Sequence, residues 1–348
     1  MISQHIINED KSLLDALHAI NSLKSNDALT LFVADKDNVI IGSLTDGDIR
    51  RSLTTNGILS TKVGSIAYRN FIYLTYGDYN LNIINSARNK GIELLPVLDE
   101  EGRIVDLVNL KKQKSFLPID AVLMAGGKGE RLRPLTENTP KPLIEVGGKA
   151  IIDYNVERLL SYGVKNIHVT VNYLAEQLEE HFAAPINGIK VETVREPNFL
   201  GTIGSVQFVK EFHNDTVLVM NSDLFTNIDY EDFYLHFKEH GADMSVAAIP
   251  YNVSIPFGIF ELDGRDIKGI KEKPSYHYYA NAGIYLIKKD VLKHHIPQNK
   301  FFNATDLIEE LVKQQMKVIR FPITGYWIDI GQHSELVKAN ELIKHLKQ

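Results

Sequence analysis

The chain has 348 residues, of which 44% are hydrophobic, and its formal net charge is −6. This length and apolar content suffice for two ordinary domains, while the acidic balance disfavours nucleic acid and anionic membrane surfaces as partners. The sequence contains no cysteine, which excludes disulfides, thiolate metal sites and a cysteine nucleophile. Since no apolar run has the length of a membrane span or a signal core, we expect a soluble cytoplasmic protein.

The first hundred or so residues contain a faint internal repeat of two copies, 12–53 and 80–112. Each copy has the pattern of a helix, a strand, a turn, a strand and a final helix. The turns are expected at residues 35–38 and 99–102, where Asp, Asn and Gly cluster. Because one copy is too small to bury its own sheet, the two copies should pack together.

The stretch "GSLTDGDIRR" at 42–51 resembles the motif of tandem CBS domains, and the resemblance covers roughly 1–115. It implies an α+β pair in which Thr45 and Asp48 bind the ribose and phosphates of AMP or ATP. A helix N-terminus attracts phosphate, but Thr45 could equally serve only as a helix cap. In the second copy the aligned positions are Asn109 and Lys112, so the motif is lost there. A pair that forms a dimer and binds nothing stays open.

A basic linker, "KKQKSFLP", separates the domain expected at 1–115 from a second domain expected at 116–348. In the second domain short apolar strands alternate with helical patterns, which predicts an α/β fold with a doubly wound, mostly parallel, Rossmann-like sheet. Ligands of such sheets bind at the carboxyl ends of the strands. The strands are expected at 119–124, 166–171, 190–194, 216–220 and 244–249.

A glycine-rich loop, "AGGKGERLRP", follows the first of these strands. It is not a Walker A loop, because the residue after Lys128 is Gly129 in place of Ser or Thr. A Rossmann fingerprint would need a third glycine where Leu132 stands. The backbone N–H groups of Gly126, Gly127 and Gly129 could still approach a triphosphate closely, so we expect a phosphate cradle of another kind.

The stretch from "AVLMAGGKGERLRPLTENTPKPLIEVGGKAIIDY" onward closely resembles the sugar-1-phosphate nucleotidyltransferases, whose fold is glycosyltransferase-A-like. The resemblance continues in order through "EPNFLGTIGSV", "NSDLF", "PFGIFELD", "IKEKP", "NAGIYLI" and "WIDIG". It implies that a nucleotidyl group passes from a nucleoside triphosphate to a sugar 1-phosphate, with release of pyrophosphate. Such chemistry depends on positioning and on neutralising charge.

The resemblance also implies roles for single residues. Arg131 would steady the leaving pyrophosphate, Lys141 would hold phosphate oxygens, and Lys273 would pair with the attacking phosphate. Asp223 and Asp329 would bind Mg²⁺, whose preferred ligands are oxygens. Taken singly, either acid could instead be a helix cap or a turn residue.

Glu272, Asn281 and Gly283 correspond to sugar-binding positions, where the polar side chains would hydrogen-bond sugar hydroxyls. A charged hairpin and a strand-capping Asn are the structural alternatives. Glu196 and Gly201 would line the base pocket, and the form "LGTIG" favours GTP over dTTP.

The whole arrangement resembles the CBS-linked glucosamine-1-phosphate guanylyltransferases of legionaminic acid synthesis, and more loosely the guanylyltransferases for heptose phosphates. We therefore expect an enzyme of cell-surface glycan biosynthesis that forms a homo-oligomer, a dimer or tetramer. Two alternatives remain open. One is a cytidylyltransferase for phosphocholine or another non-sugar phosphate, and the other is a catalytically inactive subunit that senses nucleotides.

Overall fold

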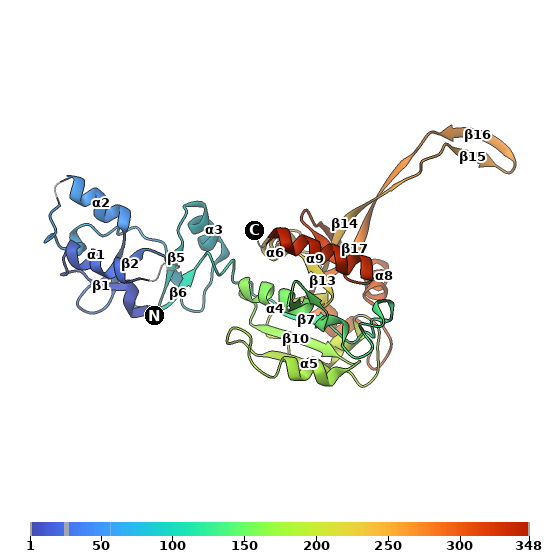
Figure 1. Cartoon of the computed structure of the whole chain (residues 1–348), viewed down its shortest axis with the longest axis horizontal. Coiled ribbons are helices and arrows are strands. Elements are labelled where there is room, and N and C mark those ends of the chain that lie inside the picture. The colour runs from blue at the N-terminus through green and yellow to red at the C-terminus, as the bar shows by residue number, and fades with distance from the viewer. Residues whose placement is uncertain (1, 24–27, 56, 347–348) are drawn as a thin grey trace. The chain divides into compact units, whose positions relative to one another are not determined.

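The computed structural model describes residues 2–23, 28–55 and 57–346. The chain divides into two compact units, Met1–Phe116 and Leu117–Gln348 (Figure 1). The boundary falls inside the basic stretch that the sequence analysis took as a linker. Among the described residues, every helix is too short or too polar to cross a membrane.

The N-terminal unit contains two small sheets with the same topology. In each, the first strand pairs in parallel with the second, and the second pairs antiparallel with the third. Helix α1 begins with a capping box, in which the side chains of Ser12 and Asp15 each accept a hydrogen bond from the other residue's backbone N–H group. The elements are β1 (Ile6–Asn8), α1 (Leu13–Ser22), β2 (Thr30–Ala34), β3 (Ile40–Thr45), α2 (Asp46–Thr55), β4 (Leu74–Thr75), α3 (Leu81–Asn89), β5 (Leu94–Leu98) and β6 (Ile104–Asn109), with short 3-10 helices η1 (Ile2–His5) and η2 (Val63–Ser65).

Both predicted turns are confirmed, and they use the same chemistry. An Asp carboxylate begins each turn: Asp35 accepts hydrogen bonds from the N–H groups of Asp37 and Val39 at 2.8 and 3.0 Å, and Asp99 accepts from Arg103 at 2.8 Å. Each turn ends in the left-handed region, at Asn38 with φ 63° and at Gly102 with φ 80°. Side-chain acceptors that mimic a backbone turn explain why these sequences reverse the chain.

The predicted final helix of the second copy is wrong. In the first copy α2 follows β3, but in residues 110–119, all of them described, the chain makes one turn after β6 and then runs without a helix. The Asn109 side chain accepts a hydrogen bond from Lys111 N–H, which favours a turn. Lys111 and Lys112 would place positive charge at the positive end of the helix dipole, where α2 has Asp46 and Asp48.

The two copies pack on each other, as expected for units too small to bury their own sheets. Ile40 N–H of the first copy donates to Gly102 O of the second at 3.0 Å. Apolar side chains of both copies form one core cluster, made by Ala28, Phe32, Ala34, Ile40, Leu94 and Leu98. The two small sheets of the unit therefore share one hydrophobic core.

The C-terminal unit is an α/β fold built on a central, mostly parallel sheet with the strand order β11-β10-β7-β12-β17-β14-β18. Within it β17 is antiparallel to both neighbours, and the other pairings are parallel. The five predicted strands are present, although the one expected at 244–249 is five residues longer. The strands are β7 (Asp120–Met124), β10 (Asn166–Val171), β11 (Val191–Arg195), β12 (Thr216–Asn221), β14 (Met244–Ser254), β17 (Ser275–Lys288) and β18 (Val318–Pro322).

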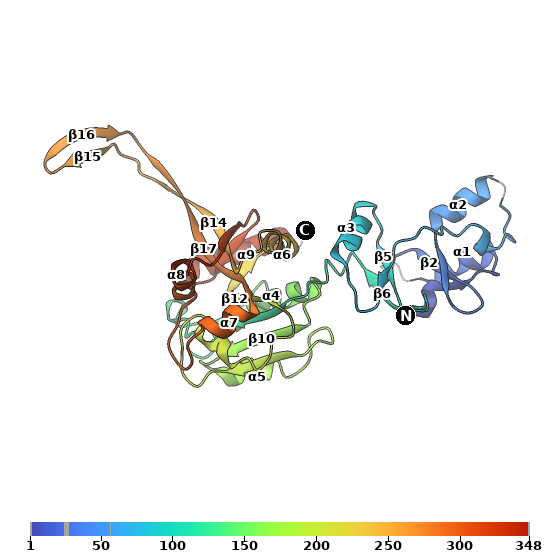
Figure 2. The same cartoon turned by 180° about the vertical axis from the view of Figure 1, so that it is seen from behind.

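Helices cover both faces of this sheet, because its central strands are apolar on both sides. Val217 and Val219 of β12 join a core cluster with side chains of α7 and α8, while Met220 accepts a hydrogen bond from the Tyr230 hydroxyl of α6. Figure 2 shows the helices from behind. The helices are α4 (Ile151–Ser161), α5 (Ala175–His181), α6 (Tyr230–Glu239), α7 (Lys289–His295), α8 (Ala304–Lys313) and α9 (His333–Leu346).

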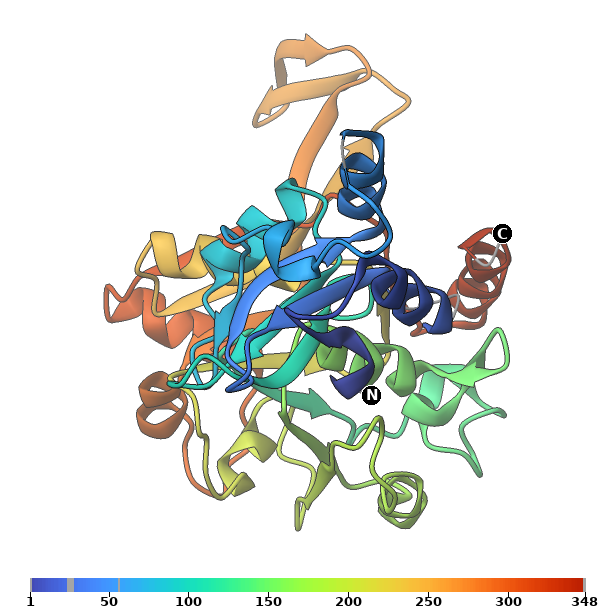
Figure 3. The ribbon, with the colours of Figure 1, turned by 90° about the vertical axis from the view of Figure 1, so that its left-hand side faces the viewer.

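A long β-hairpin projects from the C-terminal unit. The strands β14 and β17 continue past the sheet, and β15 (Ile259–Asp263) pairs with β16 (Asp266–Lys271) at the tip. The tip lies away from the helices of this unit in all three views (Figures 1, 2 and 3). We call residues 250–280 the arm. Shorter elements of the unit are η3 (Glu130–Leu132), η4 (Lys141–Leu143), η5 (Gly204–Phe208), β8 (Glu145–Val146), β9 (Lys149–Ala150), β13 (Leu224–Thr226) and β19 (Trp327–Asp329).

Asp120, at the start of β7, joins three segments of the C-terminal unit. It is fully buried and accepts hydrogen bonds from Asn166 Nδ2 at 2.9 Å and from the side chain and backbone of Asn214 at 2.7 and 3.1 Å. We expect Asp120→Ala to lower the free energy of unfolding by about 3 kcal/mol, because buried donors lose a charged acceptor. Urea unfolding followed by fluorescence of Trp327, the only tryptophan in the sequence, measures this.

The matched control is Asp215→Ala in the same loop, whose side chain is 95% exposed. It should stay within about 0.5 kcal/mol of the wild type. Equal stabilities for the two variants would contradict a structural role for Asp120.

Candidate functional site

The glycine-rich loop lies at the carboxyl end of β7, and two of its glycines are required by their surroundings. A Cβ on Gly126 would lie 2.2 Å from Oε1 of Glu196, and Gly129 has φ 63° with Lys141 and Thr136 about it. Gly127 faces open space. The loop therefore packs closely on one side and keeps its other side free for a ligand, while Lys128 is exposed.

Two carboxylates from distant parts of the sequence meet beside this loop. Asp223 follows β12, and Asp329 ends β19. The β13–β19 ladder pairs Leu224 with Asp329, and Ile330 N–H donates to Asp223 O at 3.1 Å. This short ladder brings the predicted metal ligands together.

Asn155 fixes the turn that carries Asp223, and the sequence analysis missed it. Its side-chain amide, buried within α4, donates to Ser222 O at 3.2 Å and to Leu224 O at 2.9 Å. The signal was an Asn inside the apolar pattern of "IIDYNVERLL", because a buried amide needs partners.

Lys141 lies between the two acids. Its ammonium group forms an ion pair with Asp223 Oδ2 and lies 3.7 Å from Asp329 Oδ1, and its side chain is 12% exposed. Lys141 begins η4, where Pro140 and Pro142 restrict the backbone on both sides. The predicted phosphate-holding cation and the predicted metal ligands thus form one cluster.

The charges and free oxygen atoms of this cluster favour binding of a cation. Burial raises the pKa of Asp329, the charge of Asp223 raises it further, and Lys141 and Arg131 oppose the shift. Oδ1 of Asp223 and Oδ1 of Asp329 are both buried without a hydrogen-bond partner. Two such oxygens fit Mg²⁺, which takes its remaining ligands from phosphate and water. Among the described residues no set of three His, Cys, Asp or Glu side chains gathers to hold a metal.

Arg131, in η3, lies beside Gly331 and shares a cavity with Asp329. A Cβ on Gly331 would come within 3.2 Å of its guanidinium group, and Arg131, Trp327 and Asp329 line a shallow cavity of about 360 Å³. Trp327 Nε1 donates to Ala282 O at 2.9 Å. This indole links β19 to β17, a contact that the motif "WIDIG" alone does not reveal.

Glu196 and Gly201 line a second, smaller cavity of about 160 Å³ together with the glycine-rich loop, Lys141 and Asp223. Glu196 is only 3% exposed, and its Oε2 accepts a hydrogen bond from Leu200 N–H at 3.2 Å. Burial raises the pKa of Glu196 to about 7. Gly201 has φ 83°, and a Cβ there would lie 2.6 Å from Phe302 O. Because the sequence analysis expects the base pocket at Glu196 and Gly201, we call this the nucleotide cavity.

Of the predicted sugar-binding residues, Asn281 and Gly283 lie near the cluster. Gly283, with φ 71°, forms a bulge in β17 against Asn221 at the end of β12. Asn281 donates to Tyr285 Oη at 3.0 Å and accepts from Gly283 N–H at 2.9 Å, so it also holds the bulge. Glu272 and Lys273 do not join the site, because both lie exposed in the arm.

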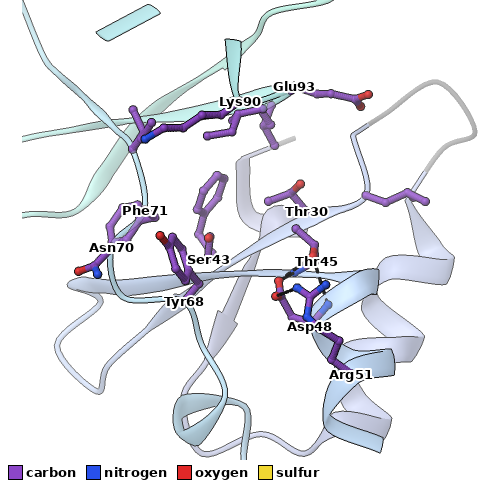
Figure 4. A pocket seen from close by; sticks show the side chains of 16 residues that line it. Thr30, Ser43, Thr45, Asp48, Arg51, Tyr68, Asn70, Phe71, Lys90 and Glu93 are labelled. Carbon is purple, nitrogen blue, oxygen red and sulfur yellow. Dashed lines mark hydrogen bonds and ion pairs between the residues drawn. The ribbon is translucent and has the colours of Figure 1, made fainter. Parts of the chain in front are cut away.

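The N-terminal unit has a cavity of its own, of about 530 Å³, between the two copies of the repeat (Figure 4). Thr45 and Asp48 line it, as does Lys90 of the second copy. The Asp48 carboxylate accepts hydrogen bonds from Thr45 N–H at 2.8 Å and Thr45 Oγ1 at 2.6 Å, and Arg51 pairs with it. Thr45 and Asp48 therefore form the helix cap considered above and also face the cavity.

Residues 120–345 match the family described as nucleotidyl transferase, and the chain belongs to that family. It is 33% identical over 232 residues to the bifunctional protein GlmU of Methanocaldococcus jannaschii, covering 65% of this chain and 54% of the relative. It is 28% identical over 236 residues to a putative mannose-1-phosphate guanyltransferase of Sulfolobus acidocaldarius, covering 66% of this chain and 64% of that protein. The chain thus spans 54% and 64% of the length of these two relatives.

Two solved structures are similar to this chain. The crystal structure of HddC from Yersinia pseudotuberculosis matches with a TM-score of 0.52 and 26% identity, over 65% of this chain and 99% of that one. A putative glucose-1-phosphate thymidylyltransferase from Bacillus anthracis matches with a TM-score of 0.51 and 25% identity, over 64% of this chain and 94% of the other.

The raised pKa of Glu196 predicts a pH-dependent stability. The folded chain holds this proton more tightly than the unfolded chain, so the contribution to stability is complete below about pH 4.5 and is lost as the pH rises through about 7. Between pH 5 and pH 8 the wild type should lose about 2 kcal/mol relative to Glu196→Gln. Urea unfolding at both pH values, followed by Trp327 fluorescence, tests this.

Glu309→Gln, at an exposed position of α8, is the control and should follow the wild type at both pH values. Parallel pH curves for the wild type and Glu196→Gln would show that Glu196 titrates as an exposed carboxyl.

Proposed function

We propose that this chain transfers a nucleotidyl group from a nucleoside triphosphate, with GTP favoured, to a sugar 1-phosphate, giving a nucleotide sugar and pyrophosphate. The observation that carries the proposal is the cluster of Lys141, Asp223 and Asp329 beside the glycine-rich loop. The names of the relatives, GlmU and mannose-1-phosphate guanyltransferase, point the same way. The sugar we expect is glucosamine 1-phosphate or a similar hexose or heptose phosphate.

In the reaction, an oxygen of the sugar phosphate forms a bond to the α-phosphorus, and the bond from that phosphorus to pyrophosphate breaks. The free face of the glycine-rich loop would receive the triphosphate through its backbone N–H groups. Lys141 would lie against phosphate oxygens and offset the repulsion between the two anions. Arg131 would stabilise the charge that develops on the departing pyrophosphate.

Asp223 and Asp329 would hold Mg²⁺, which when bound neutralises phosphate charge and orients the triphosphate. The two carboxylates are close to each other and to Lys141, so phosphate binding lets Lys141 exchange an acid partner for a phosphate partner. This coupling explains why a lysine and two acids share one site.

The preference for GTP rests on Glu196 and on the form of its loop. As a carboxylate, a buried Glu can accept hydrogen bonds from two neighbouring N–H donors, such as the ring N–H and amino group of guanine. A pyrimidine with a single ring N–H donor satisfies only one of its oxygens, which leaves a buried acceptor unpaired.

The activity test measures pyrophosphate release with Mg²⁺ for each nucleoside triphosphate against glucosamine, mannose, glucose and heptose 1-phosphates. We expect release with GTP and one of these sugars. Asp223→Asn should lower kcat at least about 100-fold, because a group that neutralises phosphate charge in the transition state is lost. Asp215→Asn, fully solvated in the same unit, should retain wild-type kinetics.

Release only with CTP and phosphocholine would favour the cytidylyltransferase alternative. Binding of nucleotide with no release across the panel would favour an inactive sensing subunit.

For the N-terminal unit we propose a tandem CBS pair that binds AMP or ATP in the cavity of Figure 4. A pocket of about 530 Å³ is large enough for a nucleotide, and Arg51 and Lys90 offer cations for phosphate. Asp48 pairs with Arg51, and it would turn toward ribose hydroxyls when a phosphate draws Arg51 away.

Calorimetry with AMP and ATP tests this second proposal. The wild type should release heat, and Lys90→Ala should weaken binding at least about 10-fold through loss of a charge-assisted contact. Asp46→Ala, on the same helix as Arg51 but outside the cavity, is the control. If neither nucleotide releases heat, and neither changes the kinetics of pyrophosphate release, the unit does not bind adenine nucleotides.

A further inference from the structure

The arm carries two residues that the sequence assigns to the sugar phosphate, Glu272 and Lys273, away from the chain's own cluster of Lys141, Asp223 and Asp329. Among the described residues neither Glu272 nor Lys273 forms an ion pair, and both are exposed. The nucleotide cavity and the cavity at Arg131 take no lining residue from the arm.

The arm is a direct extension of the central sheet. The β14–β17 ladder runs without a break from the pair Ala248 and Asn281 to the pair Ser254 and Ser275. At about 3.4 Å per residue, this carries the chain roughly 20 Å beyond the sheet. Ile255 N–H then donates to Pro274 O at 3.0 Å, so the two strands stay paired next to Lys273.

The arm exposes many large apolar side chains, which is unfavourable for a two-stranded ribbon surrounded by water. A two-stranded ribbon has no interior of its own and is marginally stable alone, and exposed apolar patches mark contact surfaces. The large apolar side chains of the arm that are 37 to 72% exposed are Tyr251, Val253, Phe257, Phe260, Leu262, Ile267, Ile270, Tyr278 and Tyr279. At roughly 100 Å² each, these nine side chains together expose about 900 Å², as much as the roughly 800 Å² per partner of a standard interface.

A receiving surface lies at the rim of the nucleotide cavity. Phe199 lines that cavity and packs edge-on against Phe301, with ring centroids 6.0 Å apart. The two rings are 50% and 58% exposed. In the same cavity Lys141 already faces two carboxylates, so a second phosphate still needs a cation.

We propose that the arm of one chain docks at this rim on a second copy of the chain and places Glu272 and Lys273 in that copy's active site. The inference rests on the proposed function, since it assigns the sugar phosphate to a shared site. A second copy is the partner because it offers what the arm complements, an apolar rim beside a site that its own Glu272 and Lys273 do not enter. The exchange is reciprocal, so two arms and two bodies close a twofold dimer.

Complementation between two inactive variants tests the shared site. Lys273→Ala and Asp223→Asn chains, each expected to be inactive as a homodimer, are co-expressed with different affinity tags, and the mixed dimer is purified through both tags. One of its two sites then combines an intact body with an intact arm. We expect about half of the wild-type pyrophosphate release.

Lys210→Ala, at an exposed position outside the site, is the matched control and should show wild-type activity. A mixed dimer that is as inactive as its parents would overturn the proposal, as would full activity of Lys273→Ala alone.

Crosslinking gives a second readout that needs no activity, so failure of the proposed function and failure of the docking are distinguishable. The chain has no cysteine, so the pair Lys273→Cys and Thr202→Cys in one chain introduces the only two thiols. Thr202 is exposed and lines the nucleotide cavity, so this pair leaves both rings of the rim in place. A flexible bismaleimide should give covalent dimers on a denaturing gel. The control pair is Lys273→Cys with Val312→Cys, at a position on α8 that is 58% exposed. The proposal would be overturned by an internally crosslinked monomer, or by no more dimer than the control pair gives.

Discussion

The contact on which the C-terminal unit depends is the one between Lys141 and the acids Asp223 and Asp329. Two carboxylates that share one cation repel each other, and burial adds to the free-energy cost of keeping both charged. The cation between them offsets that repulsion, while the β13–β19 ladder and the Asn155 amide hold their backbones in place. The fold thus keeps three charges together that would separate in an unconstrained chain, and the proposed phosphate binding would use the same charges.

The sequence predicted well what local patterns decide. Apolar strands, Asp turns and the order of the motifs placed the sheet, the repeat and the glycine-rich loop, because each has a signature within a few residues. It failed at one local choice and where tertiary contacts decide. The missing helix after β6 reflects a local hydrogen bond, from Lys111 N–H to the Asn109 side chain, which competes with a helix. The roles of Asn155 and Trp327 depend on carbonyl groups far away in the sequence. The position of Lys273 depends on the length of a ladder.

Glu196 illustrates how glycine and burial act together in this site. Gly126 has no side chain, so the Glu196 carboxyl can pack against the loop, and that packing removes water from the carboxyl and raises its pKa. Gly126, which the sequence analysis expects to contact phosphate, therefore also influences the pKa of Glu196. The close packing and the expected phosphate contact both require a residue without a Cβ.

The unequal ends of the two repeats affect the stoichiometry of the N-terminal unit. A duplicated fold with equal halves would present two equivalent clefts, and occupation of one could influence the other. Here α2 supplies Asp48 and Arg51 to the cavity, whereas in residues 110–119 no corresponding helix follows β6. The pseudo-symmetry is broken at the element that would bear phosphate. If the proposed nucleotide binding holds, one chain would offer one site of this kind, and cooperativity between such sites would have to arise between chains.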